Sequence, residues 1–256
     1  SSEILWEVVA VIVFVHGVPE TAAVWNKVRA QVDRESVALA LPGFGCPRPD
    51  GFGGSKDDYA DWLVRELEAY DEPVDLVGHD WGAGLTYRVV TTRPDLVRSW
   101  AADIGNIAHP DYEWHDIGKL WQTPGEGEAF IEAQNAMTPD DQAGLFEAMG
   151  VSHEDALEMA AASDPTMGAS ILGLYRSALP NPYADWGPWS PVTKPGLVLN
   201  PADDVFGDER LAREVADQLG AQFAVIEGSG HFWPYQAPGA GAAALTAFWD
   251  GLPSST

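Results

Sequence analysis

Short apolar runs recur along the chain and predict buried β-strands. The run Val8–Val15 is unbroken and mostly β-branched, and the turn-forming residues HGVPE follow it at once. A strand that is apolar at every position is typical of a parallel sheet covered on both faces. Similar runs predict five further strands, at Ser36–Leu41, Val74–Gly78, Val97–Asp103, Gly196–Asn200 and Gln222–Glu227.

Amphipathic stretches lie between most of these runs and predict helices. They cover Asp57–Tyr70, Gly82–Thr92, Asp208–Leu219 and Gly239–Trp249. Strand alternating with helix predicts an α/β fold, a mostly parallel sheet flanked by helices. The alternation stops between residues 106 and 195, where helix-forming segments occur without a clear strand.

The chain is therefore expected to have two parts. Residues 1–105 and 194–256 form the sheet domain, and residues 106–193 form a helical domain inserted into it. No Gly/Ser tract separates the two parts, so we expect the insertion to pack on the sheet domain.

Charge and cysteine content restrict the partners. Fourteen Lys and Arg stand against 39 Asp and Glu, a net charge of −25. This field repels phosphate and anionic lipid, so we expect a small neutral substrate and neither nucleic acid nor a membrane as partner. The apolar stretch Ile4–Val15 contains Glu7 and is too short to span a bilayer. The single cysteine, Cys46, excludes an intramolecular disulfide, and we expect a cytoplasmic monomer or homodimer.

The segment Gly78-His79-Asp80-Trp81-Gly82 joins a predicted strand to a predicted helix. Glycines on both sides of a sharp strand-to-helix turn let the middle side chain project from the sheet edge as a nucleophile. Here that side chain is Asp80. A carboxylate that attacks saturated carbon forms an alkyl ester of the enzyme, which predicts an epoxide or an alkyl halide as substrate.

Hydrolysis of such an ester needs a general base and an acid that orients it. His231 follows the last predicted strand on the loop EGSGH and is the expected base. Asp204, after the strand Gly196–Asn200, is the first choice for the acid. Asp203 and Asp103 remain alternatives, Asp103 because it ends the strand after the nucleophile helix.

Backbone amides are expected to bind the oxyanion. Val18 follows the first strand and Trp81 follows the nucleophile, so their N–H groups flank the Asp80 carboxyl group. Pro19 restrains the Val18 peptide, and a cis bond there is one way to aim its N–H.

Three motifs together resemble the α/β-hydrolase superfamily, in the branch of epoxide hydrolases and haloalkane dehalogenases. HGVPE at residues 16–20 is similar to the H-G-x-P motif of epoxide hydrolases, and GHDWGA at residues 78–83 matches their nucleophile turn. GSGHFW at residues 228–233 resembles the segment with the catalytic histidine. The resemblance implies an α/β-hydrolase fold, with a helical cap inserted after the sixth strand of the family.

In epoxide hydrolases two cap tyrosines hold the epoxide oxygen. By resemblance Tyr175, in the sequence Leu-Tyr-Arg, is the second of them. The first has no clean match, because Ile117 stands at the expected place. The possible substitutes are Tyr112, Trp114 and His115.

The resemblance favours an enzyme that opens epoxides to vicinal diols without a metal or organic cofactor. Haloalkane dehalogenation with the same nucleophile is the alternative, because Trp81 follows Asp80 and a cap tryptophan could supply the second halide donor. The candidates for that donor are Trp114, Trp121, Trp186 and Trp189. A non-catalytic ligand-binding protein is a third hypothesis, and the presence of all three triad residue types counts against it.

Overall fold

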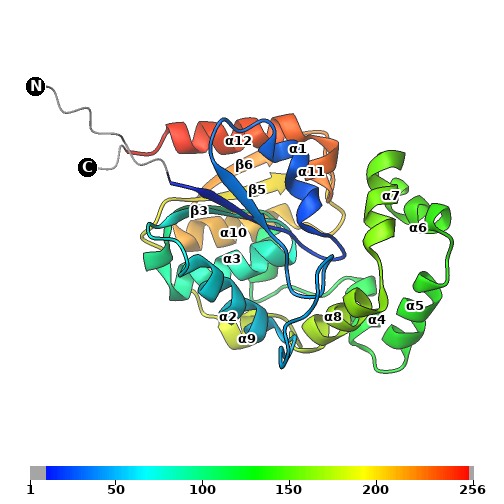
Figure 1. Cartoon of the computed structure of the whole chain (residues 1–256). Coiled ribbons are helices and arrows are strands. Elements are labelled where there is room, and N and C mark those ends of the chain that lie inside the picture. The colour runs from blue at the N-terminus through cyan, green and yellow to red at the C-terminus, as the bar shows by residue number, and fades with distance from the viewer. Residues whose placement is uncertain (1–9, 254–256) are drawn as a thin grey trace, which may run out of the picture.

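Six parallel strands of the described residues form a sheet through the centre of the fold (Figure 1). The computed structural model describes residues 10–253. In space the strands follow the order β2-β1-β3-β4-β5-β6. Their bounds are β1 Ile12–Val15, β2 Ser36–Leu39, β3 Val74–Gly78, β4 Val97–Ala102, β5 Gly196–Pro201 and β6 Gln222–Ile226.

All six predicted strands are present, and their ends differ by a few residues from the prediction. The largest difference concerns the first strand, which begins at Ile12, so that Ala10 and Val11 of the predicted run are not part of it. Val8 and Val9, the start of the predicted run, lie outside the described residues.

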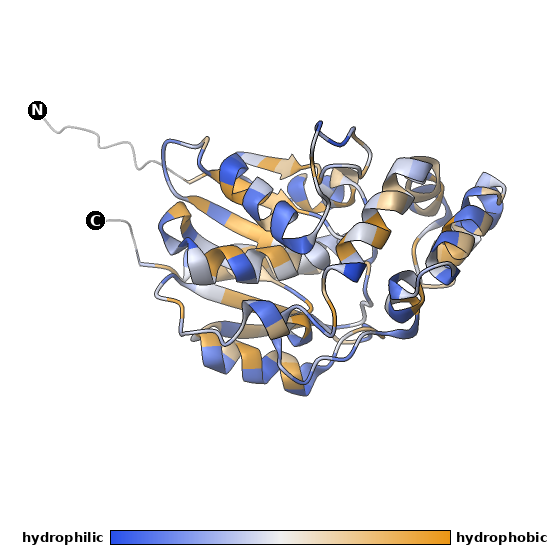
Figure 2. Cartoon of the chain, turned by 90° about the horizontal axis from the view of Figure 1, so that it is seen from below, coloured by the Kyte–Doolittle hydropathy of each residue, from blue (hydrophilic) through white to orange (hydrophobic). Residues whose placement is uncertain are grey.

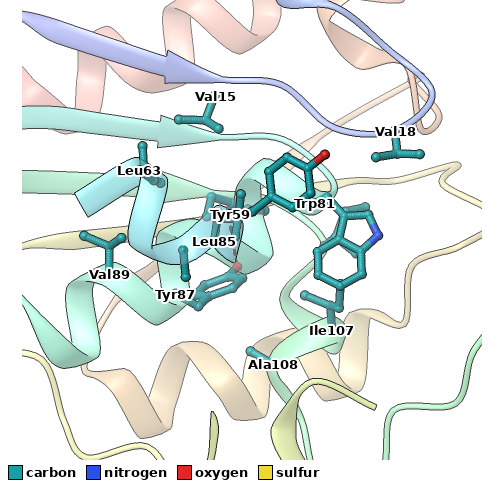
Figure 3. Packing of buried hydrophobic residues seen from close by; sticks show 14 of the residues in the cluster. Val15, Val18, Tyr59, Leu63, Trp81, Leu85, Tyr87, Val89, Ile107 and Ala108 are labelled. Carbon is teal, nitrogen blue, oxygen red and sulfur yellow. Dashed lines mark hydrogen bonds between the residues drawn. The ribbon is translucent and has the colours of Figure 1, made fainter. Parts of the chain in front are cut away.

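Side chains along the strands alternate between two hydrophobic clusters, one on each face of the sheet. Val13 and Val15 of β1 belong to the first cluster, whereas Ile12 and Phe14 belong to the second. This alternation explains why the strand is apolar at every position, since neither face is left to water. Figure 3 draws Val15 together with Leu63 and Leu85 of the covering helices, which belong to the same cluster.

The covering helices lie on both faces. On the first are α2 (Lys56–Leu67), α3 (Trp81–Thr92) and α10 (Glu209–Leu219), and on the second are α1 (Asn26–Arg29), α11 (Trp233–Gln236) and α12 (Pro238–Asp250). Short 3-10 turns occupy Ala22–Trp25, Pro94–Leu96 and Gly105–Ala108. Figure 2 shows the helices alternating between apolar and polar positions, as expected for elements with one buried side.

The helix ends follow local rules. Ser55 caps α2 in a reciprocal bond pattern with Asp58, and Asp208 caps α10 through the Leu211 amide. Gly220 ends α10 with φ of 73°, a left-handed conformation that glycine adopts without steric cost. Compared with the prediction, the helix expected at Asp57–Tyr70 ends earlier, at Leu67. The helix expected from Asp208 begins one residue later, because Asp208 is its cap.

Residues 106–193, which we call the helical segment, contain no strand among the described residues. The segment contains α4 (Asp116–Gln122), α5 (Glu126–Asn135), α6 (Pro139–Glu147), α7 (His153–Ala162), α8 (Pro165–Arg176) and α9 (Tyr183–Trp186). Helices α4, α5 and α8 contribute to the first hydrophobic cluster, whereas α6 and α7 contribute to the second. Figure 1 shows α6 and α7 apart from α4, α5 and α8. None of the helices between residues 10 and 253 has the length and apolar character needed to cross a membrane.

Candidate active site

Asp80 occupies a strained turn between β3 and α3. Its backbone has φ of 52° and ψ of −120°, values that a residue with a side chain rarely adopts. The flanking glycines are required by close packing: a Cβ on Gly78 would lie 2.3 Å from the Gly82 carbonyl oxygen, and one on Gly82 would lie 2.2 Å from that of Val15. The predicted turn is therefore confirmed, and it presents the Asp80 carboxylate at the carboxyl end of the sheet.

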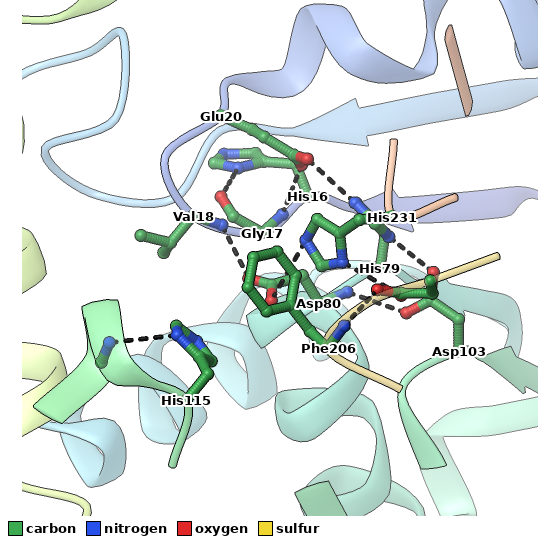
Figure 4. Close-up of polar contacts among 12 residues, drawn as sticks. His16, Gly17, Val18, Glu20, His79, Asp80, Asp103, His115, Phe206 and His231 are labelled. Atoms are coloured by element: carbon green, nitrogen blue, oxygen red, sulfur yellow. Dashed lines mark hydrogen bonds and ion pairs between the residues drawn. The ribbon is translucent and has the colours of Figure 1, made fainter. Parts of the chain in front are cut away.

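Two groups face the Asp80 carboxylate (Figure 4). The Val18 amide donates to Oδ2 at 2.8 Å, and His231 Nε2 lies 3.6 Å from Oδ1. Burial raises the pKa of Asp80 to about 6, although the His231 and His79 charges act in the opposite direction. Among the described residues the Val18 amide is bonded to this carboxylate but the Trp81 amide is not. The Val18–Pro19 peptide bond is cis.

His231 is held by Asp204. Its Nδ1 lies 3.1 Å from Asp204 Oδ2, and the Phe206 amide donates to the other oxygen of Asp204 at 2.9 Å. Burial alone would lower the pKa of His231, but the facing carboxylates of Asp204 and Asp80 raise it overall. Burial would raise the pKa of Asp204, and His231 outweighs this and lowers it. The three residues Asp80, His231 and Asp204 thus form one hydrogen-bonded and electrostatic unit.

The two alternative acids are not partners of His231. Asp103 faces away: its Oδ1 accepts from the Asp80 amide at 2.9 Å, and its Oδ2 accepts from Trp233 Nε1 at 2.6 Å. Asp203 is exposed, and its amide donates to the Ser229 carbonyl at 2.9 Å. Of the three carboxylates, the one that contacts His231 is therefore Asp204, because the loop after β5 turns its side chain toward the ring whereas Asp103 lies under the turn at Asp80.

Sequence reasoning missed a buried chain of charged groups beneath Asp80. His79 Nδ1 bonds Asp103 Oδ2 at 2.5 Å, and His79 Nε2 bonds Glu20 Oε1 at 2.9 Å. The Gly17 amide donates to the other oxygen of Glu20 at 3.1 Å. Burial disfavours a charged His79, but its two carboxylates hold its pKa well above the ordinary value. The sequence did carry a signal for two of these residues, because Glu20 belongs to the motif HGVPE and His79 belongs to the motif GHDWGA.

Glu20, His79 and His231 also bring metal-ligand atoms within 4.8 Å of one another. Both nitrogens of His79 already bond carboxylates, so this group forms ion pairs as it stands.

A cavity of about 350 Å³ opens over Asp80 and His231. Its wall includes Val18 and Phe206 from the sheet domain, and the helical segment supplies most of the rest. The apolar side chains from that segment are Ile117, Trp121, Phe130, Leu145, Phe146 and Met149. A largely apolar pocket with a few convergent polar groups is the usual form of a small-molecule site.

The structure separates the candidate oxygen-binding residues of the helical segment. Tyr175 and His115 line the cavity, and Tyr112 and Trp114 do not. Burial raises the pKa of Tyr175 well above its ordinary value, so the phenol stays protonated. The Trp114 indole donates to the Ala178 carbonyl at 3.1 Å, so that N–H has a structural partner.

His115 has a fixed tautomer. It caps α4, where its Nδ1 accepts from the Gly118 amide at 3.1 Å. Burial lowers the pKa of His115 to about 4, so the ring is neutral near pH 7. A neutral imidazole that accepts at Nδ1 carries its proton on Nε2, which makes His115 a hydrogen-bond donor on the cavity wall.

The tryptophans considered as halide donors also separate. Trp186 donates to Asp57 at 2.7 Å, and Trp189 donates to the Ala108 carbonyl at 2.6 Å. The indole nitrogens of Trp81 and Trp121 are buried and have no hydrogen-bond partner among residues 10–253. Both rings pack edge-on against Tyr175.

Comparison with known proteins agrees with this geometry. Residues 12–245 match the sequence model of the alpha/beta hydrolase family. The chain belongs to this family. The predicted fold class and the resemblance to this superfamily are thereby confirmed. A haloalkane dehalogenase is among the relatives of this chain, and a protein assigned to the epoxide hydrolases is among its structural neighbours.

The relatives of this chain are distant. It is 31% identical over 155 residues to a haloalkane dehalogenase of Bradyrhizobium diazoefficiens. The aligned region covers 49% of this chain and 47% of the relative. The chain thus spans about half the length of that relative. An AB hydrolase superfamily protein of Bacillus subtilis, YfhM, is 25% identical over 223 residues, covering 79% of this chain and 77% of that protein.

A solved structure of a protein from Pseudomonas aeruginosa, assigned to the epoxide hydrolases, superposes with a TM-score of 0.75 at 19% identity. The superposition covers 94% of this chain and 88% of the Pseudomonas chain. At this identity the likeness concerns the fold alone.

Proposed function

We propose that this hydrolase opens epoxides to vicinal diols through an ester on Asp80, with the helical segment acting as the cap over the cavity. The observation that carries the proposal is the position of Asp80. Its carboxylate lies on the wall of an apolar cavity, with Oδ2 on the Val18 amide and Oδ1 3.6 Å from a histidine held by Asp204.

In the first step Asp80 Oδ1 attacks one epoxide carbon, and the bond from that carbon to the epoxide oxygen breaks. Tyr175 and His115 both line the same cavity, and each carries a donor, the phenol O–H and the Nε2–H. They hydrogen-bond the oxygen as its negative charge develops, and the alkoxide becomes a hydroxyl by taking a proton from Tyr175, which solvent restores. His115 thus takes the place left open by Ile117.

In the second step water adds to the carboxyl carbon of Asp80. His231 Nε2 takes the proton from the water, and the charge on Oδ2 is stabilised by the Val18 amide. The bond from the carboxyl carbon to the alkyl oxygen then breaks, and that oxygen takes the proton from His231. The diol leaves with one oxygen that belonged to Asp80, and the water oxygen stays on Asp80.

Esterification also prepares the base. The negative charge of Asp80 is one of the causes that raise the pKa of His231. Once Asp80 is esterified this charge is gone, so the pKa of His231 falls and a larger fraction of the ring is neutral when the water must be deprotonated.

A single turnover in heavy-oxygen water tests the ester. We expect the label in the peptide that contains Asp80 and unlabelled diol in the first turnover. The peptide containing Asp103 is an internal control, because that carboxylate is buried against His79 and the Asp80 amide. Label in the diol with an unlabelled Asp80 would mean direct attack by water and would overturn the proposal.

Dehalogenation is the second candidate, supported by the buried indole N–H groups of Trp81 and Trp121. These could bind a leaving halide while Asp80 displaces it. A panel of epoxides and bromoalkanes separates the two candidates. Halide release without diol formation would move the assignment to dehalogenation, and binding of both classes without turnover would favour the non-catalytic hypothesis.

A further inference from the structure

One glutamine joins the loop of the catalytic histidine to the helical segment. Gln236 Oε1 accepts from the Gly230 amide at 2.8 Å, and its Nε2 donates to the Met149 carbonyl at 2.7 Å. Gly230 precedes His231, and Met149 lines the cavity in the loop between α6 and α7. The amide oxygen and the amide nitrogen of Gln236 thus bond two different parts of the site, the histidine loop and the helical segment.

The histidine loop has other restraints besides Gln236: Ser229 Oγ donates to the Ile226 carbonyl at 3.0 Å, and His231 Nδ1 bonds Asp204. The Asp203 amide donates to the Ser229 carbonyl at 2.9 Å, and α11 begins at Trp233. Between these points the Gly230 amide has Gln236 as its partner. Gln236 is therefore the side chain that holds the backbone directly before His231.

The pair α6 and α7 is fixed to the sheet domain on the same side. Phe146 of α6 packs edge-on against Phe232, with ring centroids 5.9 Å apart, and Lys27 bonds Asp155 of α7 at 2.6 Å. The pair belongs to the second hydrophobic cluster, whereas α4, α5 and α8 belong to the first. One wall of the cavity is therefore attached to the residues on either side of His231.

Asp80 is linked to α11 only indirectly, since Trp233 of that helix donates to Asp103 at 2.6 Å. It is set by the glycine-flanked turn, and its amide and carboxylate are held by Asp103 and Val18. We therefore expect a change at Gln236, which bonds the residue before His231, to move the base more than the nucleophile.

We propose that Gln236 is a positioning residue that sets His231 for hydrolysis of the ester through its bond to the cavity wall at Met149. This inference rests on the proposed ester chemistry. It assigns Gln236 to the second step alone, because attack by Asp80 on the substrate needs no general base.

The test uses Gln236→Met, which keeps the length of the side chain and removes both hydrogen bonds. The matched control is Gln218→Met, since Gln218 Nε2 bonds the Trp189 carbonyl at 2.9 Å away from the cavity. Single-turnover mass spectrometry of the Asp80 peptide gives the rates of ester formation and ester decay. The substrate is an epoxide turned over by the wild-type protein.

In Gln236→Met we expect ester formation within about twofold of wild type and decay slowed by about tenfold or more, since small misplacements of a catalytic group are costly. In the steady state kcat and KM fall together and kcat/KM is unchanged. Gln218→Met should match wild type in every rate. Equal decay rates in Gln236→Met and wild type would overturn the inference, whereas absence of an ester in wild type would overturn the proposed function instead.

Gln236→Glu keeps an acceptor for the Gly230 amide and loses the donor to Met149. Each variant is measured at the plateau of its own pH profile, because the new carboxylate raises the pKa of His231. Decay slower than wild type supports the bond to the cavity wall. Decay equal to wild type would show that the loop bond suffices and would overturn that bond's role. The thermal unfolding of both variants is compared with that of wild type, so that a slower decay is not mistaken for a folding defect.

Discussion

Two histidines lie side by side in this protein, with ring centroids 5.0 Å apart, and each stands between two carboxylates. His79 bonds Glu20 and Asp103 at both nitrogens. His231 bonds Asp204 at one nitrogen, while its other nitrogen faces Asp80 at 3.6 Å across the cavity wall. The same residue types therefore build one closed unit and one open unit.

The difference shows that access decides the chemistry. A histidine whose two nitrogens are both bonded and fully buried has no position left for a water or a substrate. Its positive charge instead balances two buried carboxylates, one of which holds the nucleophile turn through the Asp80 amide. His231 keeps one nitrogen on the cavity, where it can exchange a proton.

The substitution His231→Gln should have the largest effect on the difference between the two histidines. Loss of the base should slow ester hydrolysis by about 10²- to 10⁴-fold and leave the fold intact, so that the Asp80 ester accumulates. Mass spectrometry of the intact protein after mixing with substrate checks this. The control is His153→Gln, an exposed ion-paired histidine that should leave the rate unchanged. Undiminished turnover in His231→Gln would contradict the assignment of the base.

The matched substitution His79→Gln should act on stability first. It leaves Glu20 and Asp103 buried without their positive partner, and breaking a buried ion pair costs about 3–5 kcal/mol. Urea unfolding followed by far-UV circular dichroism measures the change in the free energy of unfolding. A stability equal to wild type would show that His79 is not the charge partner of both carboxylates.

The smallest effect concerns pH. Asp80 must be ionised to attack, and its pKa is raised to about 6. The rate of ester formation should therefore rise with pH through about 6 and fall to about a tenth of its plateau near pH 5. Because the His231 charge lowers the pKa of Asp80, the midpoint should move to higher pH in His231→Gln. Single-turnover rates between pH 4.5 and 8 check both statements, and a pH-independent rate would contradict them.

Much of the fold could be predicted because it depends on local pattern. A strand covered on both faces must be apolar at every position, and the run at β1 shows this directly. The nucleophile turn was also readable, because the close approach of Gly78 and Gly82 to neighbouring backbone excludes other residues. Helix ends were less accurate, since Asp57–Tyr70 is amphipathic beyond the point where α2 stops.

The site was only partly predictable. Asp204 and Asp103 both follow strands at the same edge of the sheet, and the chain order does not say which carboxylate turns toward His231. The choice among Tyr112, Trp114 and His115 had the same limit. Neighbours in sequence differ there in what their polar atoms contact, as the bond from Trp114 to Ala178 shows.

By itself the sequence determined the parallel sheet, the turn that projects Asp80 and the histidine that follows the last strand. These depend on residues adjacent in the chain and on steric limits that no distant contact can relax. The tertiary structure decided which acid orients His231, that Glu20 joins His79, and that His115 reaches the cavity. Each of those outcomes depends on which polar atoms find partners among segments far apart in sequence, and a hydrogen bond is made only where folding has brought donor and acceptor together.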